Sequence, residues 1–225
     1  MKQIKSPQTG LSDNKPASSM TMADTDDAAN AGQHSTIELN LTNHFLIAMP
    51  SLQDPVFGGS VVFVCEHNQR GAMGMVINRP TDMTVAGLFD RIDLKLENIP
   101  DSHPIGKNLV MFGGPVQDDR GFVLHVPVGN YTSSLQVTDD IAFTTSRDVL
   151  EAIAAGDGPE RVLMSVGYAG WGAGQLEKEM LSNSWLTVQA DPDVMFALPL
   201  EERFNAAIKL LGIDPLMLAS IAGHA

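Results

Sequence analysis

The tripeptide Cys65-Glu66-His67 places a thiol, a carboxylate and an imidazole at the end of an apolar run. In a β-strand, Cys65 and His67 would project to the same side. An imidazole that lowers the thiol pKa would create a nucleophile, and a partly exposed thiol near a cation would be a redox sensor. Two ligands do not complete a zinc site, so we predict no metal. The residues favour a buried apolar Cys65 and a His67 that caps backbone groups, with Cys65 kept as the candidate redox residue.

A second candidate is the glycine-rich stretch at residues 167–175, GYAGWGAGQ, between an apolar run and a helical pattern. A strand, glycines and a helix in this order can cradle a phosphate. Here the Gly-Lys-Ser/Thr and Gly-x-Gly-x-x-Gly patterns are both missing, and Glu177 and Glu179 would repel an anion. We therefore predict no cofactor and expect the glycines to let Tyr168 and Trp171 pack at a crowded crossing. An exposed Trp171 beside backbone N–H groups would instead offer a ligand platform.

Polar groups follow or interrupt other apolar runs as well. Asn78-Arg79 ends one run, and Arg79 could clamp a carboxylate or phosphate, although a structural salt bridge is favoured. Gly113-Gly114 forms a turn, and the pair Asp118-Asp119 fits a solvated hairpin tip better than a catalytic carboxylate pair. His125 lies inside an apolar strand pattern, which indicates a hydrogen-bonded core histidine.

A predicted β-hairpin positions the first of these groups. The run Ser60–Cys65 is apolar without alternation, which indicates a strand covered on both faces. After the polar loop Glu66–Arg70, Met73–Ile77 returns as the second strand. Gly74 would weaken a strand, so it predicts a bulge or a close backbone approach. The hairpin therefore gathers its polar groups at one end.

The rest of the chain interleaves strands with helices and includes hairpins, which favours a mixed sheet over a doubly wound parallel one. Further strands are predicted at Phe45–Met49, Leu109–Phe112, Gly121–Val126, Ser134–Val137, Ile141–Phe143, Arg161–Val166 and Trp185–Val188. Helices are predicted to begin at Thr84 as an N-cap, at a capping box from Thr145, at Gly174, and at Pro199 in the first helical position. The strands Leu109–Phe112 and Gly121–Val126 are expected to pair with each other across the loop Val116–Arg120.

The 225-residue chain carries 14 Lys and Arg against 27 Asp and Glu, which gives a formal net charge of −13. It contains no Lys/Arg cluster, so direct nucleic-acid binding is disfavoured. Cys65 is the one cysteine and excludes an intrachain disulfide. No apolar run approaches the about 18 residues needed to span a membrane, and no secretory pattern opens the chain, so we predict a cytoplasmic protein.

The first 36 residues are polar and poor in apolar side chains, and they predict a disordered tail. Residues 37–225 are then expected to form a single domain. The natural start could be Met1, Met20 or Met22.

Three blocks of this sequence resemble the YqgE/AlgH family of bacterial proteins. They are FLIAMPSLQDPVFGGSVVFVCEHNQRGAMGMVINRP at residues 45–80, MFGGPVQDDRGFVLH at residues 111–125, and GYAGWGAGQLEKEMLSNSWL at residues 167–186. The resemblance covers residues 37–225. It implies an α+β fold with a strongly bent, partly barrel-like sheet surrounded by helices. The family name comes from a proposed regulator of alginate production, and the resemblance brings no agreed catalytic residues.

The leading hypothesis is a non-enzymatic module that binds a small ligand or a protein, with a regulatory role suggested by the family name. We expect the candidate surface to gather polar strand ends and exposed aromatics, namely Glu66, His67, Arg70, Asn78, Arg79, Gly113, Gly114, Tyr168, Trp171 and Gln175. The alternative is a thiol-dependent enzyme, such as a hydrolase, or a redox sensor that uses Cys65 with His67. The oligomeric state is left open.

Overall fold

The computed structural model describes residues 39–96 and 104–215. The predicted disordered tail of residues 1–36 lies outside the described residues, as does part of the connection after the first helix. In the described part of the chain, no helix combines the length and the apolar character that a membrane crossing requires.

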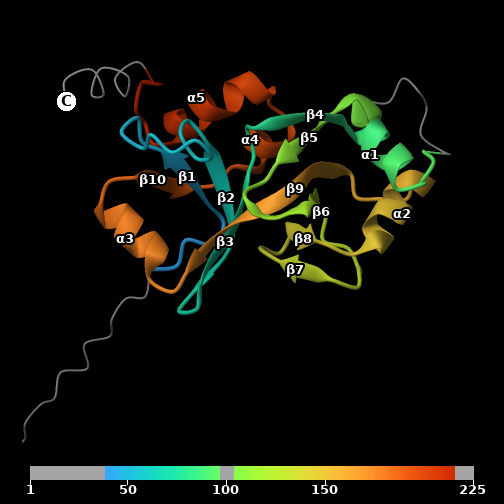
Figure 1. Cartoon of the computed structure of the whole chain (residues 1–225), viewed down its shortest axis with the longest axis horizontal. Coiled ribbons are helices and arrows are strands. Elements are labelled where there is room, and N and C mark those ends of the chain that lie inside the picture. Colours follow the sequence, from blue (N-terminus) through green and yellow to red (C-terminus); the bar gives the residue numbers. More distant parts are fainter. Residues whose placement is uncertain (1–38, 97–103, 216–225) are drawn as a thin grey trace, which may run out of the picture. The chain divides into compact units, whose positions relative to one another are not determined.

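Ten strands of the described chain form one strongly curled mixed sheet, in which β9 runs through the centre (Figure 1). The hydrogen-bonded order is β10-β1-β2-β3-β9-β6-β8-β7, and β5 joins β4 to β9 outside this path. The strands are β1 His44–Ala48, β2 Val61–Asn68, β3 Gly71–Val76, β4 Pro80–Thr84, β5 Leu109–Phe112, β6 Val116–Val126, β7 Ser134–Gln136, β8 Ala142–Thr144, β9 Arg161–Gly172 and β10 Trp185–Gln189. Most pairs are antiparallel, and β5 pairs with β9 in parallel. The predicted mixed α+β fold is therefore confirmed.

Helices cover both faces of the sheet. They are α1 Val85–Arg91, α2 Arg147–Ala155, α3 Gln175–Leu181, α4 Pro192–Phe196 and α5 Leu200–Leu210, with a 3₁₀ turn at Pro104–Lys107. Thr84 is the predicted N-cap, because its hydroxyl accepts a hydrogen bond from the N–H of Gly87 at 3.1 Å. The capping box predicted for α2 is wrong, since Ser146 is the N-cap and its side chain makes no capping bond. Pro199 precedes α5 as its N-cap rather than filling its first position.

The core explains why β2 reads as a continuous apolar run. Val61, Phe63 and Cys65 join one cluster, under α4 and α5, while Val62 and Val64 join a second cluster, with α3. All five side chains are at most 1% exposed, so the predicted double coverage is confirmed. Burying a large apolar side chain contributes about 1.5–3 kcal/mol to folding, and this strand therefore ties the two layers together.

Several boundaries differ from the prediction because partners distant in sequence extend the strands. β9 continues through the glycine-rich stretch to Gly172, where it pairs with β3. β6 begins at Val116 instead of Gly121, because Val116 pairs with Tyr168 of β9. The predicted pairing of strand 109–112 with strand 121–126 is wrong, since β5 pairs with β4 and β9. The sequence prediction also missed β4 and α4.

Candidate functional site

An open groove of about 320 Å³ lies where the tip of the β2–β3 hairpin meets β9 and the start of β6. We call it the hairpin groove. It is lined by Glu66, Asn68, Arg70, Gly71, Ala72, Met73, Val116, Tyr168, Gly170 and Trp171. The hairpin groove thus unites residues from three segments that are far apart in the sequence.

Glycines build the wall of the hairpin groove by letting backbones approach closely. A Cβ at Gly71, where φ is +131°, would lie 2.1 Å from the carbonyl oxygen of Trp171. At Gly74 a Cβ would lie 2.6 Å from the carbonyl oxygen of Phe63, which confirms the predicted close approach. The backbone of β3 therefore lies close to β9 at Gly71 and close to β2 at Gly74.

The rim of the groove is polar. Glu66 accepts a hydrogen bond from the side-chain amide of Asn68 at 2.9 Å and lies 3.8 Å from the guanidinium of Arg70. The side chain of Arg70 is 87% exposed, so this ion pair contributes little to stability. These side chains keep their charge available to a partner at the surface.

The floor of the groove is apolar. Met73, Val116 and Tyr168 are each partly exposed, and the Tyr168 ring packs edge-on against Phe122 at 5.4 Å between centroids. A Cβ at Gly170 would touch the Tyr168 ring and Val116 at 3.4 Å, so the missing side chain leaves the floor open. Partly exposed apolar groups beside a charged rim are typical of an interaction surface.

Trp171 does not form the exposed ligand platform that was one of the two predictions for it. Its ring is 6% exposed, stacks on Phe57 at 6.0 Å between centroids, and donates from Nε1 to Oε2 of Glu179 at 2.9 Å. Trp185 donates to the same carboxylate oxygen at 2.8 Å. Gln175 donates to Oε1 of Glu179 at 3.0 Å and accepts from the N–H of Gly172. The glycines of residues 167–175 therefore let the aromatic side chains pack closely, as the sequence predicted.

His67 lies on the opposite face of the sheet from Cys65, contrary to the expected alternation. A register shift between Val64 and Glu66 inserts a bulge at Cys65, which reverses the alternation beyond it. Cys65 accordingly packs in the cluster under α5, whereas the imidazole of His67 meets α3. The structure does not form the thiol–imidazole pair that a thiol-dependent enzyme requires.

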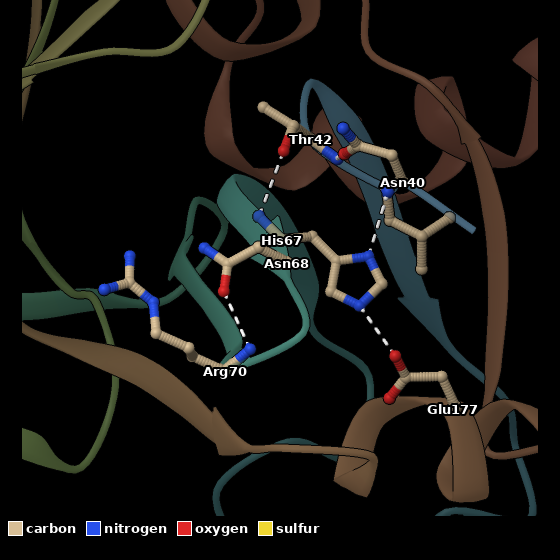
Figure 2. A network of polar contacts seen from close by, with 7 residues as sticks. Asn40, Thr42, His67, Asn68, Arg70 and Glu177 are labelled. Carbon is tan, nitrogen blue, oxygen red and sulfur yellow. Dashed lines mark hydrogen bonds and ion pairs between the residues drawn. The ribbon is translucent and has the colours of Figure 1, made fainter. Parts of the chain in front are cut away.

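Figure 2 shows the contacts of His67. The N–H of Leu41 donates to Nδ1 at 3.0 Å, so Nε2 carries the proton and donates to Oε1 of Glu177 at 3.0 Å. The backbone N–H of His67 donates to the hydroxyl of Thr42 at 3.0 Å. The residue is 4% exposed and ties the chain entering β1 to the sheet and to α3. These contacts fit the predicted role of capping backbone groups.

The thiol of Cys65 is 1% exposed, and burial raises its pKa above the ordinary range. A redox sensor or a nucleophile requires an accessible thiolate, and the structure provides neither the access nor the ionisation. Among the described residues, no group of three His, Cys, Asp or Glu side chains is arranged to hold a metal ion.

Asn78 and Arg79 brace the loop before β2 and do not reach the hairpin groove. Arg79 donates to the carbonyl oxygens of Pro55 and Gly58, each at 2.8 Å. The side chain of Asn78 accepts from the N–H of Val61 at 2.8 Å. The salt bridge favoured for Arg79 is not formed with any described carboxylate, because backbone carbonyls take its place.

The two glycines of the turn before β6 have a steric role. A Cβ at Gly113 would lie 2.3 Å from the carbonyl oxygen of Gly167, and one at Gly114 would lie 2.3 Å from the carbonyl carbon of Tyr168. His125 is fully buried and makes hydrogen bonds with Thr144 at 2.8 Å and with the carbonyl of Pro127 at 2.9 Å, which confirms the core histidine. Asp118 and Asp119 are exposed in the first half of β6.

A family model described as AlgH-like matches residues 45–216. The chain belongs to the AlgH-like family. A UPF0301 protein of Cupriavidus pinatubonensis is 63% identical over 187 residues, which cover 83% of this chain and 96% of that protein. A UPF0301 protein of Bordetella pertussis is 54% identical over 206 residues, which cover 92% of this chain and the full length of that protein.

Two solved structures resemble this AlgH-like chain. The solution structure of the AlgH protein from Pseudomonas aeruginosa is 48% identical, covers 84% of this chain and 97% of its own, and superposes with a TM-score of 0.67. A crystal structure of a Corynebacterium diphtheriae protein has a TM-score of 0.61 at 17% identity, covering 81% of this chain and 91% of its own, and shows the fold alone. Both solved structures therefore share the curled α+β architecture of this chain.

Of the residues predicted for the site of this AlgH-like chain, the groove collects Glu66, Arg70, Tyr168 and Trp171. The others are placed elsewhere, as described above. The sequence-based prediction included Asn68 within the loop Glu66–Arg70 but missed Met73 and Val116, which also line the groove. The sequence carries no local signal for these residues, because only the pairing of β3 and of β6 with β9 brings Met73 and Val116 next to Tyr168.

Proposed function

We propose that this AlgH-like protein is a non-enzymatic binding module whose hairpin groove accepts a segment of a partner protein. The observation that carries the proposal is the combination of an apolar floor with a charged rim. Met73, Val116 and Tyr168 offer apolar surface to solvent, and Glu66 and Arg70 stand at its edge. Such a patch is typical of a site that contacts another protein.

The open form of the groove supports a chain segment as the occupant rather than an enclosed small molecule. Small-molecule sites bury most of the ligand surface, whereas a segment of a partner needs contact on one side only. Tyr168 is the expected anchor, because it combines a rigid aromatic ring with a hydroxyl that can form a hydrogen bond.

The charge balance supports a basic or neutral partner. The net charge of −13 steers positively charged segments towards the protein and repels nucleic-acid phosphates. Direct contact with DNA is therefore not part of the proposal. Binding without chemistry would suit a regulatory role in the cytoplasm, and the relative from Pseudomonas aeruginosa carries the AlgH name.

Photo-crosslinking in the native host cells tests this proposal. A benzoylphenylalanine at position 68 replaces Asn68 on the rim and leaves the floor intact. We expect a discrete crosslinked partner protein, identified by mass spectrometry. Tyr168→Glu should reduce the crosslink by at least about tenfold, because it places a charge at the centre of the contact.

Leu181→Glu is the matched control. Leu181 lies on α3 outside the hairpin groove and is 84% exposed, so the same type of change there should leave the crosslink intact. Equal crosslinking in the Tyr168 and Leu181 variants would contradict the proposal. A crosslink to a second copy of this chain would also contradict it, since the groove would then serve self-association.

A further inference from the structure

A second cavity, of about 320 Å³, lies between the turn that joins α4 to α5 and the strands β5 and β9. It shares no lining residue with the hairpin groove. Apolar side chains line part of it, among them Met111, Leu163, Met195 and Leu198, while polar atoms make up the larger share of its accessible surface. Arg203 is the one charged side chain among the described residues that line it.

Arg203 is buried on the inner face of α5. It stands three residues after Leu200 and four before Ala207, on the apolar stripe of the helix, and is 7% exposed. It donates from Nη1 to the carbonyl oxygen of Ile77 at 2.5 Å and from Nε to that of Leu198 at 3.2 Å. The two carbonyls fix the orientation of the guanidinium.

The positive charge of Arg203 has no counterpart in the described chain. Two of its five N–H groups make the bonds above, and no described carboxylate lies within 4.0 Å of it. By contrast, Arg161 at the start of β9 is paired with Asp193 at 3.0 Å. Buried charges in proteins are normally paired, because desolvation is costly. Burial lowers the pKa of Arg203 to about 10, which still leaves the group charged at neutral pH.

We propose that this cavity binds a small organic carboxylate, with the carboxylate on Arg203 and the hydrocarbon part against the apolar side chains around the α4–α5 turn, such as Phe196 and Leu198. Arginine matches a carboxylate with parallel N–H donors, and the first turn of α5, where Pro199 and Leu200 line the cavity, adds the positive end of a helix dipole. Glu201 and Glu202 of the same turn are exposed and do not line the cavity. The volume lies at the lower end of the about 300–1,000 Å³ of known ligand sites, so the ligand is small.

Calorimetric titration of the full chain with sodium hexanoate tests the proposal, with hexan-1-ol as the neutral analogue of the same length. We expect hexanoate to bind with a Kd of about 1 mM or tighter. Hexan-1-ol should bind at least about tenfold more weakly, because it lacks the charge-assisted hydrogen bonds. Inorganic phosphate is the third titrant, and we expect no binding, since it has no apolar part.

Two variants separate binding from folding. Arg203→Met removes the charge, and Arg79→Met is its matched control, because Arg79 also donates to two backbone carbonyls but lines neither this cavity nor the groove. Ala197→Phe fills the mouth of the cavity from an exposed position and leaves Arg203 with its two carbonyls. We expect hexanoate binding to fall at least about tenfold in Arg203→Met and in Ala197→Phe and to persist in Arg79→Met.

Circular dichroism confirms that each variant is folded, and if Arg203→Met does not fold, Ala197→Phe decides the outcome. Absence of hexanoate binding at millimolar concentration would overturn the proposal. Equal binding of hexan-1-ol, unchanged binding in Ala197→Phe, or tighter binding of phosphate than of hexanoate would do the same. None of these measurements involves the hairpin groove, so failure of this proposal would not contradict the proposed function.

Discussion

Cys65 and His67 are two residues apart in the chain and serve different layers of the molecule. The bulge at Cys65 sends the thiol into the cluster under α5 and the imidazole towards α3. One extra residue in a strand is enough to reverse which face each later side chain occupies. A motif that places a thiol near an imidazole in sequence therefore does not place them together in space.

Cys65 should resist alkylation in the folded protein. Iodoacetamide at pH 7 requires an accessible thiolate, and this thiol is 1% exposed with its pKa raised by burial. We expect no mass increase in the native protein and complete labelling of Cys65 in denaturant. Rapid labelling of the native protein would restore the thiol enzyme and the redox sensor as candidates.

The contact between Glu177 and His67 should make stability depend on pH. The backbone N–H of Glu177 and the hydrogen bond from His67 lower the pKa of this carboxyl, while partial burial acts in the opposite direction. A carboxyl whose folded pKa lies below its unfolded value of about 4.3 stabilises the fold above that pH, and the contribution is lost as the pH falls through the folded pKa. Glu177→Gln should therefore lower the free energy of unfolding at pH 7 by less than about 1 kcal/mol, because the carboxylate is partly exposed. In strong acid the substitution should leave the free energy of unfolding unchanged.

Urea unfolding at several pH values measures this dependence. Glu151→Gln is the control, since it removes an exposed ion pair to Arg147 with the same 3.0 Å separation. The interpretation fails if the Glu177 variant loses as much stability at pH 2 as at pH 7.

At the scale of the elements, the contact between β3 and β9 shapes the hairpin groove. The two strands pair from Gly71↔Gly172 to Gly74↔Ala169, and glycines occupy the positions where backbones come closest. β3 is short, yet it joins the β1–β2 half of the sheet to the β9–β6 half. Its fit against β9 therefore decides whether the groove exists.

Gly71→Ala should destabilise the protein by roughly 2–3 kcal/mol or more, because the new Cβ meets a carbonyl oxygen and the residue has a positive φ. Gly121→Ala is the matched control, since a Cβ there has no neighbour within 4 Å and its φ is ordinary. The free energy of unfolding in urea compares the two. Equal effects would mean that β3 can move away from β9 at little cost.

At the scale of the whole molecule, a net charge of −13 limits which partners can approach. The acidic excess opposes nucleic acid and favours basic segments over the entire surface, independently of any single site. The curled sheet then determines which parts of that acidic surface are hollowed, among them the hairpin groove and the cavity beside Arg203.

We expect no specific binding of duplex DNA at about 150 mM salt, with any dissociation constant weaker than about 10⁻⁴ M. Fluorescence anisotropy with labelled duplexes at increasing salt measures this directly. The prediction fails if DNA binds saturably at that ionic strength with an affinity that falls as salt rises, since that result would require a local basic surface despite the negative net charge.

The sequence by itself determined the class and the main elements of this protein. Apolar runs such as Ser60–Cys65 predict buried strands because side-chain burial dominates folding, and the three sequence blocks indicate the family. The tertiary structure alone decided how strands distant in sequence pair, where β9 ends and on which face His67 lies. These depend on backbone pairing between distant segments and on a single bulge, which local side-chain patterns do not encode. Arg203 shows the same limit, since its uncompensated charge is visible only when the neighbours of α5 are in place.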